Sequence, residues 1–106
     1  MARGNVDSTL DALVRALCLD YPRRERAISE RSVSHRTDTE FRYYNFKIFD
    51  AAAEVVGEAE AEIYIKEIGE AVGYAKSDSF LISEVTYKKR KRLVMNNIAK
   101  KLHLCD

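Results

Sequence analysis

Apolar residues recur at helical spacing near the start of the chain. They lie three or four residues apart, on one face of a predicted helix: Leu10, Leu13, Val14 and Leu17. Asp7 or Ser8 is a suitable N-cap for this helix, because its side-chain oxygen can accept a hydrogen bond from a first-turn amide. Tyr21-Pro22 predicts the end of the helix, since the residue before a proline avoids helical geometry. Pro22 can open a second, short and arginine-rich helix, PRRERAISER, and residues 32–36 read as a connection.

The clearest helical pattern covers residues 38–56. Its apolar positions again recur at steps of three and four: Phe41, Tyr44, Ile48, Ala51 or Ala52, and Val55. Thr37 heads the capping box T-D-T-E, in which Glu40 stands three residues after the cap. Gly57 is a natural stop for this long helix.

A shorter helix is predicted over residues 59–72. Its apolar face contains Ala61, Tyr64, Ile65, Ile68 and Val72. The run EIYIKEI also alternates, so a strand is an alternative, but the abundance of Glu and Ala favours a helix. Gly73 closes the helix, and residues 74–82 form a loop or a short β excursion.

The last predicted helix begins after Ser83, its N-cap, and runs to about residue 103. Its inward positions are Tyr87, Val94, Ile98 and Leu102. The chain of 106 residues is therefore expected to be a single all-α domain of about five helices.

Charge is distributed unevenly along a chain whose formal net charge is only +1. Residues 38–70 contain three basic and nine acidic residues, whereas residues 83–106 contain seven basic and two acidic residues. Five consecutive cations run from Lys88 to Arg92. This polarity fits a surface that meets phosphate at one end of the molecule.

Residues 65–87 have the order expected of a helix-turn-helix. Gly69 would allow the second helix to cross closely, and Gly73 would supply a positive φ in the turn. The packing positions of the motif are Gly69, Gly73, Ile68, Val72 and Tyr87. Residues 74–81 are extra within the turn, so the motif carries an enlarged turn, which could form a small hairpin or wing. We therefore divide the single domain, residues 1–106, into an N-terminal helical part, 1–57, and a helix-turn-helix part, 58–106.

The start of the last helix is the predicted recognition surface for DNA. Residues at such a position read base edges, and flanking cations contact phosphates. Arg92 could contact guanine, and Thr86 or Val85 a thymine methyl group. The predicted DNA-binding residues are Ser83, Glu84, Val85, Thr86, Lys88, Lys89, Arg92 and Lys76.

The stretch I-S-E-V-T-Y-K-K-R-K, with the later I-A-K-K-L, resembles the C-terminal helix of ArpU/RinA-type phage transcriptional regulators. Those in turn resemble the promoter-binding region of bacterial sigma factors. The resemblance covers residues 60 to 104 and implies that residues 83–92 lie on a recognition helix. It implies a phage- or prophage-derived transcription regulator that binds double-stranded DNA. RNA polymerase and a second copy of the chain, as a homodimer, are further expected partners.

Plainer interpretations stand beside this one. A run of cations is often only a solvated helix face, and Gly69 can be a simple packing glycine. The chain could instead be a non-enzymatic helical interaction module whose acidic middle docks a basic partner, or a phage packaging component.

Several classes of function lack support in the sequence. There is no phosphate-cradling glycine loop and no Ser/His/Asp spacing, so we expect no enzyme and no cofactor. His35 and His103 have no ligand partner at metal spacing, and Cys18 and Cys105 stand far apart, so we expect neither a metal site nor a disulfide. No long apolar run or signal segment occurs, which favours a cytoplasmic protein without a membrane partner.

Overall fold

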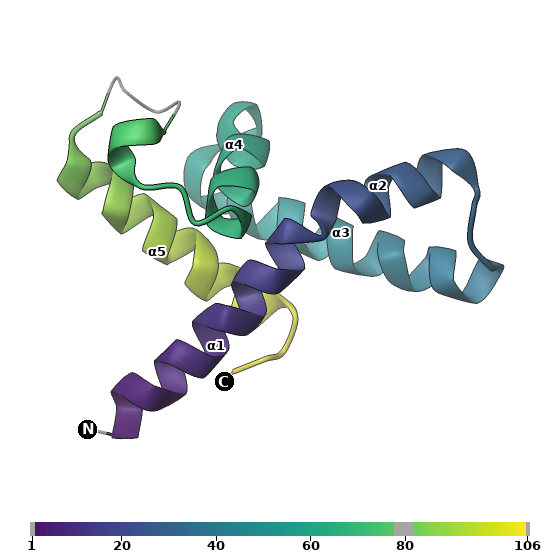
Figure 1. Ribbon diagram of the computed structural model, residues 1–106, viewed down its shortest axis with the longest axis horizontal. Coiled ribbons are helices and arrows are strands. Elements are labelled where there is room, and N and C mark those ends of the chain that lie inside the picture. Colours follow the sequence, from purple (N-terminus) through teal and green to yellow (C-terminus); the bar gives the residue numbers. More distant parts are fainter. Residues whose placement is uncertain (1, 78–81, 106) are drawn as a thin grey trace.

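The computed structural model describes the backbone of residues 2–77 and 82–105, and side chains from Ser8 onward (Figure 1). The elements are α1 (Ala2–Leu19), α2 (Tyr21–Glu30), α3 (His35–Val56), α4 (Glu58–Gly69), the 3₁₀ turn η1 (Tyr74–Lys76) and α5 (Glu84–Lys101). The described ranges contain no strand. The prediction of an all-α fold is confirmed, and the alternative of a strand within residues 62–68 is wrong.

The first two helices differ from the prediction mainly at the start of α1, and α2 spans residues 21–30 rather than 22–31. α1 begins at Ala2, so Asp7 and Ser8 lie inside the helix and neither caps it. An N-cap must leave helical geometry, and the backbone at both positions remains helical. A break near Pro22 is confirmed, because α1 ends at Leu19 and the proline lies in the first turn of α2. The reason given for it is wrong, because Tyr21, the residue before the proline, is helical and opens α2.

α3 begins three residues earlier than the capping box suggested. Ser34 is the N-cap: its backbone is extended, with φ −62° and ψ 161°, and its Oγ accepts a hydrogen bond from the Thr37 amide at 3.3 Å. Thr37 lies in the first turn, so the predicted cap at Thr37 is wrong. Both residues are good capping types, and only the extended backbone at Ser34 decides between them.

Gly57 ends α3, as predicted, and also serves as the N-cap of α4. Its φ of 88° lies in a region that side chains rarely adopt, which explains the glycine. No linker separates the two helices.

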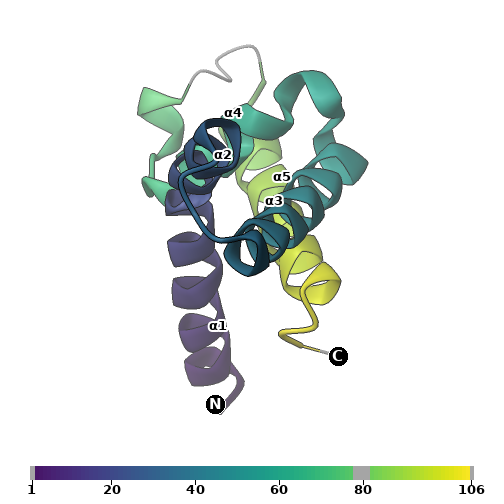
Figure 2. The same ribbon diagram turned by 90° about the vertical axis from the view of Figure 1, so that its right-hand side faces the viewer.

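α3 forms the centre of the molecule and packs on α2, α4 and α5, while α1 packs mainly on α4 and also touches α5 (Figure 2). One apolar cluster joins these helices. Its largest fully buried side chains are Tyr64, Tyr87, Ile48, Ile65, Ile68, Ile98, Val14, Val94 and Cys18. The four inward positions predicted for α5 are all buried.

The apolar stripes predicted for α1 and α3 are wrong at some positions. Leu13 is 45 % exposed and Tyr44 is 38 % exposed, and Phe41 is half-buried. In the first half of α3 the buried residue is Asn45. This half faces only the short helix α2, so the two helices form a hairpin that projects from the body (Figure 1).

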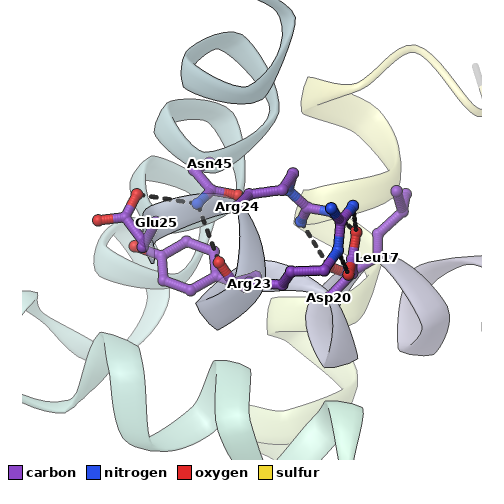
Figure 3. A network of polar contacts seen from close by, with 7 residues as sticks. Leu17, Asp20, Arg23, Arg24, Glu25 and Asn45 are labelled. Carbon is purple, nitrogen blue, oxygen red and sulfur yellow. Dashed lines mark hydrogen bonds and ion pairs between the residues drawn. The ribbon is translucent and has the colours of Figure 1, made fainter. Parts of the chain in front are cut away.

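A buried polar network joins the hairpin to the body, as Figure 3 shows. Arg24 is 3 % exposed; its Nε donates to Asn45 Oδ1 at 2.7 Å, and its guanidinium also bonds Asp20 and the Leu17 carbonyl. The Asn45 amide donates to the Tyr21 carbonyl at 3.1 Å and to Glu25 at 2.8 Å. These bonds satisfy groups whose burial would otherwise cost free energy, so the network fixes where α2 lies against α3.

Candidate nucleic-acid interface

The start of α5 has the predicted cap. Ser83 is extended, with φ −70° and ψ 159°, and its Oγ accepts a hydrogen bond from the Thr86 amide at 3.2 Å. α5 runs from Glu84 to Lys101, slightly shorter than expected. Its N-terminal end lies at the edge of the molecule opposite the α2–α3 hairpin (Figure 1).

The first two turns of α5 carry a continuous exposed face. Tyr87 is buried, so the side chains on the opposite side of the helix point outward. Val85 is 78 % exposed. Thr86 is half-buried. The exposed predicted residues are Ser83, Glu84, Val85, Lys88, Lys89 and Arg92, and Lys76, at the end of η1, is exposed as well.

The five consecutive cations have different environments, and Arg90 is half-buried. Lys88 Nζ pairs with Glu84 on the same helix at 2.8 Å, and both side chains are mostly exposed. The Arg92 guanidinium forms two bonds to Asp11 of α1, at 2.7 and 2.8 Å. Lys91 Nζ donates to the Val72 carbonyl at 2.8 Å. Lys89 is exposed and has no partner among the described residues, so it carries the most available charge of the run.

Asp11 was not anticipated from the sequence as part of this surface. Its hydrogen bonds with Arg92, and the nearby charges of Arg92 and Arg15, lower the pKa of the Asp11 carboxyl despite partial burial. The carboxylate is therefore ionised at neutral pH and holds Arg92 toward α1. The two residues are 81 positions apart, so no local spacing could have revealed the pair.

A buried carboxyl group fixes how α5 lies against α4. Glu67 is 4 % exposed, and its Oε1 accepts hydrogen bonds from Tyr87 Oη at 2.8 Å and from Ser77 Oγ at 2.7 Å. Burial, together with Glu67, raises the pKa of Tyr87 to about 12. Sequence reasoning missed Glu67, although a signal existed: it interrupts the apolar face formed by Tyr64 and Ile68.

The two glycines do not have the roles predicted for them. A Cβ on Gly69 would lie 2.6 Å from the Leu19 backbone nitrogen, so the helix that crosses closely at this glycine is α1 and not α5. Gly73 has φ −85° and ψ 171°, an extended conformation open to any residue. The left-handed residue of the turn is Ala71, with φ 55°. The predicted positive φ at Gly73 and the predicted crossing of α5 at Gly69 are therefore wrong.

The prediction is right for two of the other three packing positions of the helix-turn-helix and wrong for the third. Ile68 and Tyr87 are buried as predicted, but α4 ends at Gly69, so Val72 lies beyond the helix and is half-buried. The predicted helix over 70–72 and its end at Gly73 are wrong. α5 rests mainly on α3 and less on α4.

The turn between α4 and α5 contains a 3₁₀ segment in its described part. Residues 74–77 form η1 and an extended residue, so no β excursion occurs there. Tyr74 Oη donates to the Ile82 carbonyl at 2.6 Å, which joins the two ends of the loop. The rest of the predicted loop or wing, residues 78–81, lies outside the described residues.

The described residues form neither a metal-binding site nor a disulfide. No three His, Cys, Asp or Glu side chains among them converge as metal ligands. Cys18 is buried and Cys105 exposed, and they do not form a disulfide. Burial raises the pKa of the Cys18 thiol to about 12, so that thiol stays protonated. No described helix has the length and apolarity needed to span a membrane.

No protein-family model, curated protein or solved structure matches this chain significantly. The resemblance to ArpU/RinA-type regulators therefore stays a prediction.

Proposed function

We propose that the chain binds double-stranded DNA through the first half of α5, as a phage-type transcription regulator. In this proposal α4, the connection 70–83 and α5 act as a helix-turn-helix with an enlarged turn. The observation that supports it best is the exposed face of α5, on which Val85 lies three residues before Lys88 and four before Lys89. The N-terminal end of this helix lies at the edge of the molecule (Figure 1).

The chemistry of this face suits a DNA groove. The N-terminus of a helix attracts phosphate through its unpaired amides and its dipole. Lys88 and Lys89 would contact backbone phosphates, and the exposed methyl groups of Val85 suit the methyl group of thymine. Arg92 is bound to Asp11, so base reading falls to the side chains of Ser83, Glu84 and Val85.

The orientation of α5 is suited to recognition, because it depends on buried contacts rather than on surface pairs. The bond from Tyr87 to Glu67 and the packing of Val94 and Ile98 hold the helix from beneath. A recognition helix must be held rigidly if its side chains are to distinguish base edges. RNA polymerase and a second copy of the chain are the partners that a regulator of this type would use.

A salt series with a charge-reversal variant tests the proposal. We expect a mixed-sequence duplex to bind wild type at about 50 mM salt and to lose affinity steeply as salt increases. The K88E/K89E variant should bind at least about tenfold more weakly, and its log–log salt slope should fall by about 2, because roughly one counterion is released per phosphate contact. Fluorescence anisotropy measures both quantities.

The matched control is R26E/K47E, which makes the same charge change on the α2–α3 hairpin, away from α5. It should retain the wild-type slope and lose only a small part of the affinity through the change in net charge. If wild type fails to bind DNA at low salt, the proposal is wrong. It is also wrong if both double variants lose affinity equally, because the effect would then be one of overall charge.

A second candidate function is a helical protein-interaction module. It is favoured by three aromatic side chains that α3 exposes on the hairpin: Phe46, 65 % exposed, Tyr43 and Tyr44. Exposed aromatics are typical of protein-binding surfaces. This alternative predicts that K88E/K89E leaves partner binding unchanged and that wild type shows no salt-dependent affinity for DNA.

A further inference from the structure

Four cations from two helices surround one surface hollow between α1 and α5. The hollow has a volume of about 280 Å³ and is lined by Arg15, Lys88, Lys91, Arg92 and Met95. No acidic side chain is among these lining residues. Like charges repel, so bringing four cations together is unfavourable unless an anion compensates for them.

Among the four cations that line the hollow, Arg15 has a buried polar atom that the described part of the fold leaves unsatisfied. Its Nε is buried and has no hydrogen-bond partner among the described residues. Leaving a buried donor without a partner is unfavourable, so its presence calls for a reason. An incoming acceptor would satisfy it.

Three acids on the packed elements lie near the four cations and offset most, but not all, of their positive charge. Asp11 of α1 binds Arg92, and Glu84 of α5 binds Lys88, so each acid engages one cation at the rim. The charge of Glu67 of α4 also acts on Lys91 and favours its charged form. Burial lowers the pKa of Lys91, and the charge of Arg15 lowers it further.

We infer that this hollow receives one backbone phosphate of a bound DNA duplex, held by Arg15, Lys88 and Lys91. The inference rests on the proposed DNA-binding function and adds a phosphate contact made by α1. A phosphodiester carries a single negative charge on two free oxygens, which accept hydrogen bonds from guanidinium and ammonium groups. The Lys91 ammonium has three N–H donors. One donates to the Val72 carbonyl, and two remain available for the phosphate.

Asp11 then acts as a competitor for the phosphate. Its carboxylate occupies the guanidinium of Arg92 at the mouth of the hollow, in the same two-point geometry that a phosphate would use. Phosphate entry releases Arg92 from Asp11 or places two anions side by side. Asp11 therefore lowers the affinity for DNA, and its removal strengthens binding.

Two single substitutions test the inference against a matched control. Arg15→Met keeps most of the aliphatic stem and removes the charge, and Arg26→Met makes the same change at an exposed site on α2. For Arg15→Met we expect weaker duplex binding and a salt slope lower by about 1, the loss of one phosphate contact. Arg26→Met should keep the wild-type slope. Asp11→Asn should bind several-fold more tightly than wild type at about 100 mM salt, where phosphate contacts still contribute strongly.

The outcomes separate this inference from the proposed function. If wild type binds DNA and K88E/K89E weakens it, but Arg15→Met retains the wild-type slope, the hollow does not hold a phosphate and DNA binding still stands. If wild type does not bind DNA, both ideas are wrong.

A direct measurement on the wild-type chain covers the case in which Arg15→Met does not fold. The assigned Arg15 Nε–Hε NMR signal should shift when duplex DNA is added, and the Arg26 signal should not. An Arg15 signal unchanged at saturation overturns the inference.

Discussion

α4 contacts α1 on one flank and α5 on the other, and the two contacts are of different kinds. Toward α1, the two helix backbones approach so closely that Gly69 has no room for a Cβ beside the backbone of Leu19. Toward α5, the contact is a side-chain arrangement in which the hydroxyl of Tyr87 bonds the buried carboxyl of Glu67. One flank is a backbone contact that tolerates no added atom, and the other depends on a hydrogen bond.

This difference shows what holds the proposed recognition helix. The α1–α4 contact stabilises the body, while α5 is held by its packing on α3 and by the bond from Tyr87 to Glu67. A glycine at a helix crossing was correctly expected to mean close approach. The sequence did not reveal which helix makes that approach.

The largest effect should come from adding one methyl group at the α1 flank. Gly69→Ala places a Cβ against backbone atoms, which cannot rotate away as a side chain could. Overpacking of this kind costs about 1–3 kcal/mol, and the better helix propensity of alanine returns up to about 1 kcal/mol. We expect a net loss of about 1–2 kcal/mol in the free energy of unfolding, measured by urea titration.

Gly73→Ala is the matched control, because a Cβ at this position would have no neighbour within 4 Å and the φ of Gly73 is −85°. It should change the free energy of unfolding by less than about 0.5 kcal/mol. Equal effects at the two glycines would contradict the distinction between the flanks.

A smaller loss is expected at the α5 flank. Tyr87→Phe removes the bond to Glu67 but keeps the buried ring, so unfolding should become easier by about 1 kcal/mol, the net contribution of a typical hydrogen bond. DNA affinity should decrease together with stability if that bond orients α5. A stable variant with unchanged affinity would show that α3 alone positions the helix.

A further effect, confined to alkaline conditions, is a dependence of stability on pH. The pKa of Tyr87 is about 12 in the folded chain, against the ordinary tyrosine value of 10.0. A raised folded-state pKa stabilises the protein fully below the unfolded value, and this contribution is lost as the pH increases from about 10 to about 12. Urea unfolding of Tyr87→Phe should therefore depend less on pH in this window than that of wild type.

Tyr21 supplies the comparison for that measurement, because burial also raises its pKa to about 12. Tyr21→Phe should remove its own share of the alkaline dependence and leave that of Tyr87 in place. If Tyr87→Phe retains the full wild-type slope, the hydroxyl of Tyr87 is not buried against Glu67.

Local signals in the sequence predicted much of the helical framework. Pro22, Gly57 and Ser83 each act through their own backbone or their nearest neighbours, and each marks the boundary expected. Thr37 failed because Ser34, three residues earlier, had the same capping chemistry. Periodicity found the buried side of α5 but not that of the first half of α3, where Asn45 is buried through Arg24, a partner 21 residues away.

The candidate site was only partly predictable for the same reason. The exposed side of α5 follows from helical geometry once Tyr87 points inward, so its residues were found. Asp11 and Arg15 belong to the site only because α1 lies against α5, and Glu67 only because its carboxyl meets a loop and a helix. These relations depend on tertiary packing, which no spacing along the chain encodes.

Gly57 bears on how this chain can change in length. Gly57 alone ends α3 and begins α4, so the connection between the two helices has no additional residue that could absorb a change in length. Inserting or deleting a single residue within either helix near the corner would turn everything beyond it by about 100° and rotate Ile65 and Ile68 out of the interior. Natural variants should therefore gain or lose residues at 31–34 or 70–83, and keep the spacing from Ile48 to Ile68 constant.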